Sequence, residues 1–218
     1  MYDDGAEASV DGVRRTYDRI AEHFASTRRH AWPEVESFLD GRVGAVGLDV
    51  GCANGRHLEL LAERTDRAIG VDVSRSLLKM ATERARERGY ADRIALLQGD
   101  GAALPLSADT VDLAVYVATL HHLPTRETRV GSLDELARTL APGGAAVVSA
   151  WSVAADRFDR EEAHDATVEW TLPSGETVPR FYHVYDRAEF DADLERSGLI
   201  VERVFVSSGN CYAVVRGA

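Results

Sequence analysis

Short apolar runs alternate along the chain with segments in which apolar residues recur at helical spacing. The runs predict buried strands at 44–50, 68–73, 94–100, 111–118 and 145–151. The helical spacing predicts helices at 10–24, 32–40, 56–65, 76–89 and 126–141. Because nearly every position of the runs is apolar, we expect a mostly parallel sheet that helices cover on both faces.

The last part of the chain has a different pattern. Residues 152–180 are polar and show no clear period, so we expect an irregular segment there. A helix is expected at 186–198, followed by strands at 199–206 and 210–216. These two strands are so close in sequence that they predict a hairpin, which puts an antiparallel strand into the sheet edge.

The predicted fold class is therefore α/β, a doubly wound and mostly parallel seven-stranded sheet of Rossmann type with an antiparallel C-terminal strand. We expect one domain made of four parts. These are a helical cap (1–43), a cofactor-binding core (44–151), a substrate-side insert (152–185), and a C-terminal helix with its hairpin (186–218).

Composition limits the location and the partners. The 218 residues include no apolar run of the roughly 20 needed to span a bilayer, and the first residues do not resemble a signal peptide. Cys52 and Cys211 form no metal-type spacing. We therefore expect a cytoplasmic protein without a membrane partner. The net charge is −11 and Lys79 is the only lysine, which is typical of a halophilic archaeon or of an acidic protein from a GC-rich genome. In high salt, the total charge says little about partners.

The first candidate site is the loop DVGCANG, which follows the first predicted strand. Gly51 and Gly55 allow the backbone to approach a ligand closely, and the next helix offers free N–H groups. Asp72 ends the second strand, 23 positions after Asp49, where a doubly wound fold holds a ribose. Gly99-Asp100-Gly101 follows the third strand and places an acid where it could meet an adenine amino group. These turns all lie at the carboxyl ends of strands and predict one nucleotide-binding crevice.

The charge of this crevice favours S-adenosylmethionine over a dinucleotide. The glycines are spaced G-x-x-x-G, whereas nicotinamide and flavin enzymes carry G-x-G-x-x-G. Asp49, just before the first glycine, would repel a pyrophosphate and attract a sulfonium or an amino-acid ammonium group. The residues expected to bind S-adenosylmethionine, or its product S-adenosylhomocysteine, are Asp49, Gly51, Cys52, Ala53, Gly55, Asp72, Val73, Asp100, Gly101, Ala118 and Leu120.

The order of these motifs over residues 44–216 resembles the class I methyltransferases. Outside that core, the segment 17–39 (YDRIAEHFASTRRHAWPEVESFL) resembles the amino-terminal motif of the enzymes that esterify 5-carboxymethyluridine at the tRNA wobble position. DVGCANGR, LHHLPTR, LAPGG, AAVVSAW and RFYHVYDRAEF are similar to further motifs of that family. The likeness covers about residues 17–216.

The chain also departs from the family's pattern. The second loop glycine is Ala53, Val-Pro-Trp is Val168-Glu169-Trp170, and Asp-Asn-Trp-Trp is Gly209-Asn210-Cys211-Tyr212. The family's variable insert is nearly absent. The last two departures bear on the substrate pocket, so a related substrate stays open as an alternative.

The turn after the fourth strand narrows the chemistry. Amine and adenine methyltransferases of this class carry Asn/Asp-Pro-Pro-Tyr there, but this chain has Leu120-His121-His122-Leu123. Adjacent histidine side chains diverge, and no third ligand stands at a fixed offset, so we expect no metal.

The resemblance implies esterification of a carboxylate. A carboxylate is a nucleophile at neutral pH without a base, so catalysis consists of alignment and the exclusion of water. Arginine has the planar geometry that orients a carboxylate and a uracil. The candidate catalytic residues are Arg28, His121, Arg180 and Tyr182. Arg14, Arg15 and Arg29 are interpreted as a solvated face or as phosphate contacts, and Trp32 and Phe38 as core.

The resemblance also implies two partners, which are a tRNA anticodon loop and a small zinc-ribbon activator subunit that pairs with a sheet edge. Two other classes stay open. A small-molecule methyltransferase, for example one acting on a quinone ring, shares the core but usually has a larger apolar lid. A module that binds the cofactor without transfer is disfavoured by the intact acidic positions.

Overall fold

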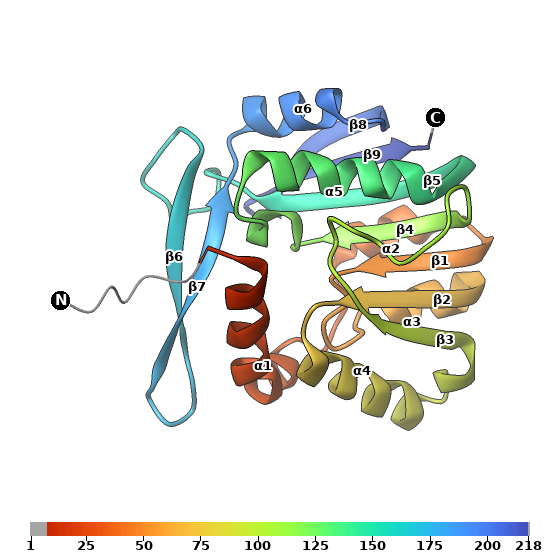
Figure 1. Ribbon diagram of the computed structural model, residues 1–218, viewed down its shortest axis with the longest axis horizontal. Coiled ribbons are helices and arrows are strands. Elements are labelled where there is room, and N and C mark those ends of the chain that lie inside the picture. Colours follow the sequence, from red (N-terminus) through yellow and green to blue (C-terminus); the bar gives the residue numbers. More distant parts are fainter. Residues whose placement is uncertain (1–7, 218) are drawn as a thin grey trace.

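The computed structural model describes residues 8–217 (Figure 1). Its main sheet has seven strands in the order β3-β2-β1-β4-β5-β9-β8. The strands are β1 (Gly44–Val50), β2 (Thr65–Asp72), β3 (Ile94–Gln98), β4 (Val111–Val117), β5 (Leu140–Trp151), β8 (Ile200–Ser207) and β9 (Asn210–Arg216). Strands β1 to β5 run parallel, and β9 runs antiparallel to β5 and β8. The predicted α/β class is confirmed.

Helices connect these strands. They are α1 (Val10–Thr27), α2 (Pro33–Leu39), α3 (Leu58–Arg64), α4 (Arg75–Arg88), α5 (Arg126–Thr139) and α6 (Arg187–Arg196), with single 3₁₀ turns η1 (Ala91–Arg93) and η2 (Leu120–His122). Helix α4 shows how the sequence sets helix ends. The Ser74 side chain accepts a hydrogen bond from the N–H of Leu77, and Gly89 ends the helix with φ +76°. No helix within residues 8–217 is both long and apolar enough to cross a membrane.

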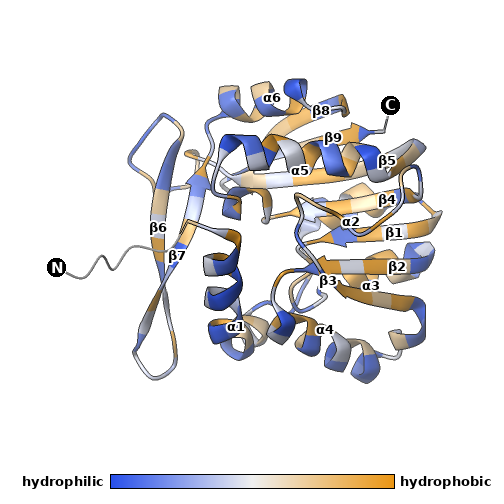
Figure 2. Ribbon diagram, viewed as in Figure 1, coloured by the Kyte–Doolittle hydropathy of each residue, from blue (hydrophilic) through white to orange (hydrophobic). Residues whose placement is uncertain are grey.

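The core lies on both faces of the main sheet, as the continuous apolar strands predict. On β4, Ala114 and Tyr116 pack in the cluster that includes residues of α5 and α6. Leu113 and Val115, at the alternate positions, pack in the cluster that includes residues of α2 and α3. Figure 2 shows the same layering, with hydrophobic strands at the centre and helices that have one polar side. The packed sheet thus sets where the loops at its strand ends lie.

The structure corrects the prediction of an irregular segment at 152–180. That region contains β6 (His164–Thr171) and β7 (Thr177–Val184), which pair antiparallel as a separate two-stranded sheet. The period of two is present in β6, where Ala166, Val168 and Trp170 alternate with exposed polar residues, but the polar residues around it led the sequence argument to overlook it. In Figure 1 this hairpin stands at the left, and α1 lies between it and α4.

The structure also refines the C-terminal hairpin. The antiparallel strand β9 lies between β5 and β8, so β8 and not β9 is the edge strand. The physical reason is burial, because nearly every residue of β9 is buried whereas most of β8 is exposed. An apolar strand is more stable inside the sheet than at its edge.

Candidate functional site

A cleft is lined by the loops that follow β1 to β4, by α1 and by β7. It lies where the strand order reverses between β1 and β4, the usual ligand position in doubly wound sheets. The expected cofactor residues that line it are Gly51, Cys52, Ala53, Asp72, Val73, Asp100, Gly101 and Ala118. Asp49, Gly55 and Leu120 are buried and are not part of its lining. The residues expected at the substrate end, Arg28, His121, Arg180 and Tyr182, all line the same cleft.

Both the backbone conformation and the lack of space for a side chain require glycine at position 51. Its φ is +70°, and a Cβ there would lie 2.1 Å from Oγ1 of Thr119. Ala53 (φ +47°) and Ala118 (φ +56°) adopt the left-handed region without being glycine. Such a conformation costs roughly 1–2 kcal/mol per residue, and strain of this kind clusters at ligand sites. The two loops that meet here therefore leave a narrow space suited to a ligand that touches backbone.

Asp72 is held firmly at the end of β2. Its Oδ2 accepts a hydrogen bond from the backbone N–H of Ala53 and its Oδ1 one from that of Ser74, each at 2.8 Å. Burial raises the pKa of Asp72 to about 6, which leaves the carboxylate ionised at neutral pH. Each oxygen keeps acceptor capacity for a further donor. This geometry fits the two hydroxyl groups of a ribose.

Asp49 lies in β1, two residues before Gly51, and its side chain is 2% exposed. Its Oδ2 has no hydrogen-bond partner within the described residues, and burial raises its pKa to about 8. An unpartnered buried polar atom costs about 1–3 kcal/mol, which a cation bound above the loop would offset. This orphaned oxygen, the tight space above Gly51 and the Asp72 carboxylate together fit S-adenosylmethionine.

Arg180 is a buried cation with no acidic partner within residues 8–217. It is 7% exposed, its Nη1 donates to the Tyr182 hydroxyl at 2.5 Å, and its Nε has no partner. Its guanidinium carbon lies 4.8 Å from the ring centre of Trp170. The guanidinium carbon of Arg28 lies 5.4 Å from the centre of the same ring. Trp170 thus brings both predicted substrate arginines to one end of the cleft.

The two histidines after β4 have different tautomers. Nδ1 of His121 accepts a hydrogen bond from the backbone N–H of Trp151 at 2.9 Å, which leaves the proton on Nε2. Nδ1 of His122 donates to the carbonyl of Phe181 at 3.0 Å, and its Nε2 accepts from the Tyr17 hydroxyl at 2.8 Å. Burial lowers the pKa of His122 to about 3 and that of His121 well below its usual range. Both are neutral at pH 7. In the described part of the chain, no group of three or more His, Cys, Asp or Glu side chains could hold a metal ion.

Polar contacts fasten α1 to the cofactor loops. Nδ2 of Asn54 donates to the carbonyl of Arg28 at 2.8 Å. Oδ1 of Asp18 accepts from the hydroxyl of Ser74 at 2.7 Å and from the N–H of Ser76 at 3.0 Å. The segment that carries Arg28 is therefore fixed relative to the loops after β1 and β2.

The other arginines of this region differ in their surroundings. Arg14 and Arg15 both form ion pairs with Asp11, so their charge is balanced within α1. Arg29 is exposed. For Arg14 and Arg15 these pairs favour the interpretation of a solvated helix face over that of phosphate contacts.

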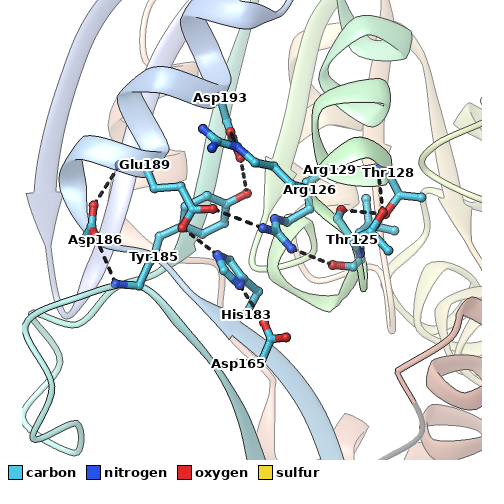
Figure 3. A network of polar contacts seen from close by, with 12 residues as sticks. Thr125, Arg126, Thr128, Arg129, Asp165, His183, Tyr185, Asp186, Glu189 and Asp193 are labelled. Carbon is cyan, nitrogen blue, oxygen red and sulfur yellow. Dashed lines mark hydrogen bonds and ion pairs between the residues drawn. The ribbon is translucent and has the colours of Figure 1, made fainter.

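The hairpin that carries Arg180 is anchored to the main body by a polar network (Figure 3). His183 of β7 lies between two carboxylates, at 2.7 Å from Asp165 and 2.9 Å from Glu189. The other oxygen of Glu189 accepts from Nη2 of the buried Arg129 on α5 at 3.2 Å. Because Glu189 joins a side chain of β7 to one of α5, it sets the position of the hairpin.

Several residues at the cleft were missed by the sequence argument. Trp32 was expected in the core, and it packs against core residues but also lines the cleft. Phe38, which was also expected in the core, is buried there. Arg56 and His57 also line the cleft. Because they directly follow the glycine loop, their position in the sequence could have predicted this. Tyr17, Phe24, Trp151 and Asn210 come from distant segments that only the fold brings together.

Residues 48–148 match a family model described as a methyltransferase domain. The tRNA (carboxymethyluridine(34)-5-O)-methyltransferase of Saccharomyces cerevisiae is 35% identical over 180 residues, which cover 80% of this chain and 62% of that protein. The protein of the same name from Schizosaccharomyces pombe is 27% identical over 210 residues, 85% of this chain and 87% of that protein. The chain spans only 37% and 20% of two further such relatives, from Arabidopsis thaliana and Mus musculus.

Solved structures show the same fold. The CcbJ methyltransferase from Streptomyces caelestis has a TM-score of 0.72 at 19% identity, over 100% of both chains. A methyltransferase chain in complex with the Haloferax volcanii Trm112 methyltransferase activator has a TM-score of 0.66 at 18% identity, over 94% of this chain and 97% of that one. Residues 48–148 are therefore similar to a methyltransferase domain, the chain has the fold of these solved methyltransferases, and its sequence is similar to that of the tRNA carboxymethyluridine methyltransferases.

Proposed function

We propose that this protein binds S-adenosylmethionine in the cleft and methylates the carboxylate of 5-carboxymethyluridine, or of a close derivative, at the tRNA wobble position. The observation that carries the proposal is Arg180, a buried guanidinium group without an acidic partner in the described residues, beside Arg28. A buried cation without a counter-ion is costly, and a bound carboxylate would supply the missing charge. The names of the relatives indicate the same substrate class.

The cofactor end is proposed to use the carboxylates at the strand ends. Asp72 would hold the ribose hydroxyl groups and Asp100 the adenine amino group, while the backbone around Gly51 lies against the amino-acid part. When bound, S-adenosylmethionine supplies an electrophilic methyl group on a sulfonium. The residues of this chain bind that group, orient the acceptor and exclude water.

The substrate end is proposed to act without a general base. The acceptor carboxylate is ionised at neutral pH, and the neutral imidazoles of His121 and His122 have no proton to take from it. Arg28 and Arg180 would orient the carboxylate, and the Tyr182 hydroxyl holds Arg180 in position. His121 can donate a hydrogen bond through Nε2.

Aromatic side chains would keep water from the substrate end. The ring of Tyr182 lies 4.4 Å from that of Trp151 and 4.9 Å from that of His121, measured between ring centres. An anticodon base could turn out of its stack and enter the cleft beside these rings, because loop bases are only loosely stacked. A quinone-type small-molecule substrate is the alternative, but it gives the buried charge of Arg180 no counterpart.

The test is methyl transfer from labelled S-adenosylmethionine to tRNA that carries carboxymethyluridine, beside tRNA with unmodified uridine at the same position. We expect label only in the carboxymethylated tRNA, in a product that mild base hydrolyses as an ester. Transfer to both RNAs at equal rates would overturn the proposed substrate.

We also propose that a small zinc-ribbon activator subunit pairs with a free edge of the main sheet. One structural neighbour was solved with the Trm112 activator. The edge strand β8 exposes Ile200 and Val206, at 53% and 46%, and its backbone can accept a further strand. Co-expression with such an activator should raise the solubility of this chain and its rate of methyl transfer. A stable and fully active lone chain at low salt would contradict this. We propose that the protein acts in the cytoplasm.

A further inference from the structure

Asn210, the first residue of β9, is a buried amide that lines the cleft. It is 4% exposed, and its Nδ2 donates to the carbonyl of Ser208 at 2.9 Å. Its Oδ1 is buried and accepts no hydrogen bond from the described residues. The bond to Ser208 fixes the orientation of the amide, so Asn210 presents a free acceptor and, beside it, the second hydrogen of Nδ2. A buried acceptor without a donor is destabilising, which points to a ligand that supplies one.

The place of Asn210 in the sheet separates it from the proposed nucleoside contacts of the cofactor. Strands β4 and β5 lie between β1 and β9. At the usual spacing of strands, the start of β9 is about 14 Å from β1. The loops after β2 and β3, which carry Asp72 and Asp100, lie on the other side of β1 and are farther away. The ligand group that meets Asn210 is therefore one on the methyl acceptor.

Trp151 connects Asn210 with the arginine end of the cleft. The two residues are directly opposite each other in the pairing of β5 with β9. Such residues point to the same face of a sheet, with Cβ atoms about 5 Å apart. The ring of Trp151 lies 4.4 Å from that of Tyr182, whose hydroxyl accepts from Arg180. A flat acceptor beside Trp151 can thus present one edge to Asn210 and a substituent to Arg180.

We propose that Asn210 selects uracil over cytosine by hydrogen bonding to the base edge next to the reacting substituent. The inference rests on the proposed function. In 5-carboxymethyluridine, the acceptor O4 and the donor N3–H are the ring positions that follow the substituted C5. With the carboxylate held by Arg28 and Arg180, Oδ1 of Asn210 accepts from N3–H and the second hydrogen of Nδ2 reaches O4. Cytosine has a donor and an acceptor in the opposite order, and the bond to Ser208 keeps the amide from turning over to match them.

The experiment compares two synthetic anticodon stem-loops that differ only in the wobble base, which is 5-carboxymethyluridine or 5-carboxymethylcytidine. Single-turnover transfer from labelled S-adenosylmethionine gives a rate for each RNA, and the ratio of the two rates is the readout. We expect the parent to prefer the uridine RNA about tenfold or more, which is the discrimination of one good bidentate contact. Asn210→Ala should slow the uridine reaction and bring the ratio to within about twofold, because that contact is lost. Its affinity for S-adenosylhomocysteine should stay at the parental value.

The matched control is Asn54→Ala, which removes the other asparagine of the chain, a buried amide whose Oδ1 is also unpartnered but which does not line the cleft. Because Nδ2 of Asn54 donates to the carbonyl of Arg28, this variant should slow both reactions alike and keep the parental ratio. Thermal unfolding reports folding, and Asn210→Leu, which fills a similar space, carries the same test if the alanine variant unfolds.

Two results would overturn the role of Asn210 alone. These are equal rates of the parent on both RNAs, and a parental ratio in a folded Asn210→Ala variant that has slowed on both. Absence of transfer from the parent to either RNA would instead refute the proposed function, and this inference with it.

Discussion

The two ends of the cleft are built in different ways. The cofactor end consists of loops that follow successive parallel strands, so the order of the sheet alone brings Gly51, Asp72 and Gly101 together. The substrate end joins α1, η2 and β7, which come from distant parts of the chain. Its geometry therefore depends on side-chain contacts, such as the network around Glu189 and the stacking of two arginines on Trp170.

The two ends also differ in the kind of buried ionisable group that lacks a charged partner within the described residues. At the cofactor end, one oxygen of the buried Asp49 carboxyl has no hydrogen-bond partner, and at the substrate end the buried guanidinium of Arg180 has no acidic partner. Burial raises the pKa of Asp49 to about 8, so a bound cation would favour its ionised form, whereas the charged Arg180 needs an anion. This difference suits a cationic methyl donor that meets an anionic acceptor.

The largest expected effect comes from breaking the anchor of the substrate end. Glu189→Ala leaves the buried Arg129 without its carboxylate and should lower the free energy of unfolding by roughly 3 kcal/mol. Methyl transfer should fall, while S-adenosylhomocysteine binding stays near the parental value, because the cofactor loops are not touched. Urea unfolding and calorimetry measure the two effects. The control is Asp165→Ala, whose side chain is 60% exposed and should matter little. Equal stability of the two variants would contradict the anchor.

The next effect belongs to the cofactor end. Asp72→Ala removes the carboxylate proposed to hold the ribose and should weaken S-adenosylhomocysteine binding by about 1.5–3 kcal/mol, the range for charged hydrogen bonds. Calorimetry of the free protein measures it. An unchanged affinity would show that the nucleoside does not lie against β2.

Replacing an arginine of the substrate end should have a smaller effect, which is confined to methyl transfer. Arg28→Ala or Arg180→Ala should lower single-turnover transfer at least about tenfold, equal to ~1.4 kcal/mol, while cofactor affinity stays within about twofold. Lysine at either position should rescue poorly, because a point charge cannot replace the planar fork. If a lysine variant restores the full rate, the orienting role of the guanidinium group is wrong.

The smallest expected effect is that of pH on transfer. Since no base is required, the single-turnover rate at saturating cofactor should stay flat between about pH 7 and 9. The free energy of unfolding, in contrast, should fall at lower pH. The pKa of His122 is about 3 in the folded protein, below its value of about 6.5 when unfolded. The unfolded state therefore takes up protons first, and stability that is complete above about pH 6.5 is lost as pH falls towards the folded pKa. A rate that rises with a single pKa near neutrality would indicate a general base.

The sequence predicted the strands beside the proposed cofactor end better than the elements beside the proposed substrate end. The strand at Gly44–Val50 has the predicted bounds, because its apolar run is continuous and a glycine loop ends it. The β6–β7 hairpin was missed although β6 alternates with a period of two, because the whole segment 152–180 is polar and its short alternating run was overlooked. The tautomers of His121 and His122 depend on contacts with Trp151 and Tyr17 that no local pattern reveals. The division into four parts stays a prediction.

The most direct test of the account is nucleoside mass spectrometry of carboxymethylated tRNA after incubation with the protein and deuteromethyl-labelled S-adenosylmethionine, for the parent and for Arg180→Ala. The account predicts that the parent places the label on the carboxymethyl group of the wobble uridine as a base-labile ester. It predicts that Arg180→Ala does so at least about tenfold more slowly with cofactor binding intact. Label on a ring or backbone atom, or transfer by Arg180→Ala at the parental rate, would contradict it.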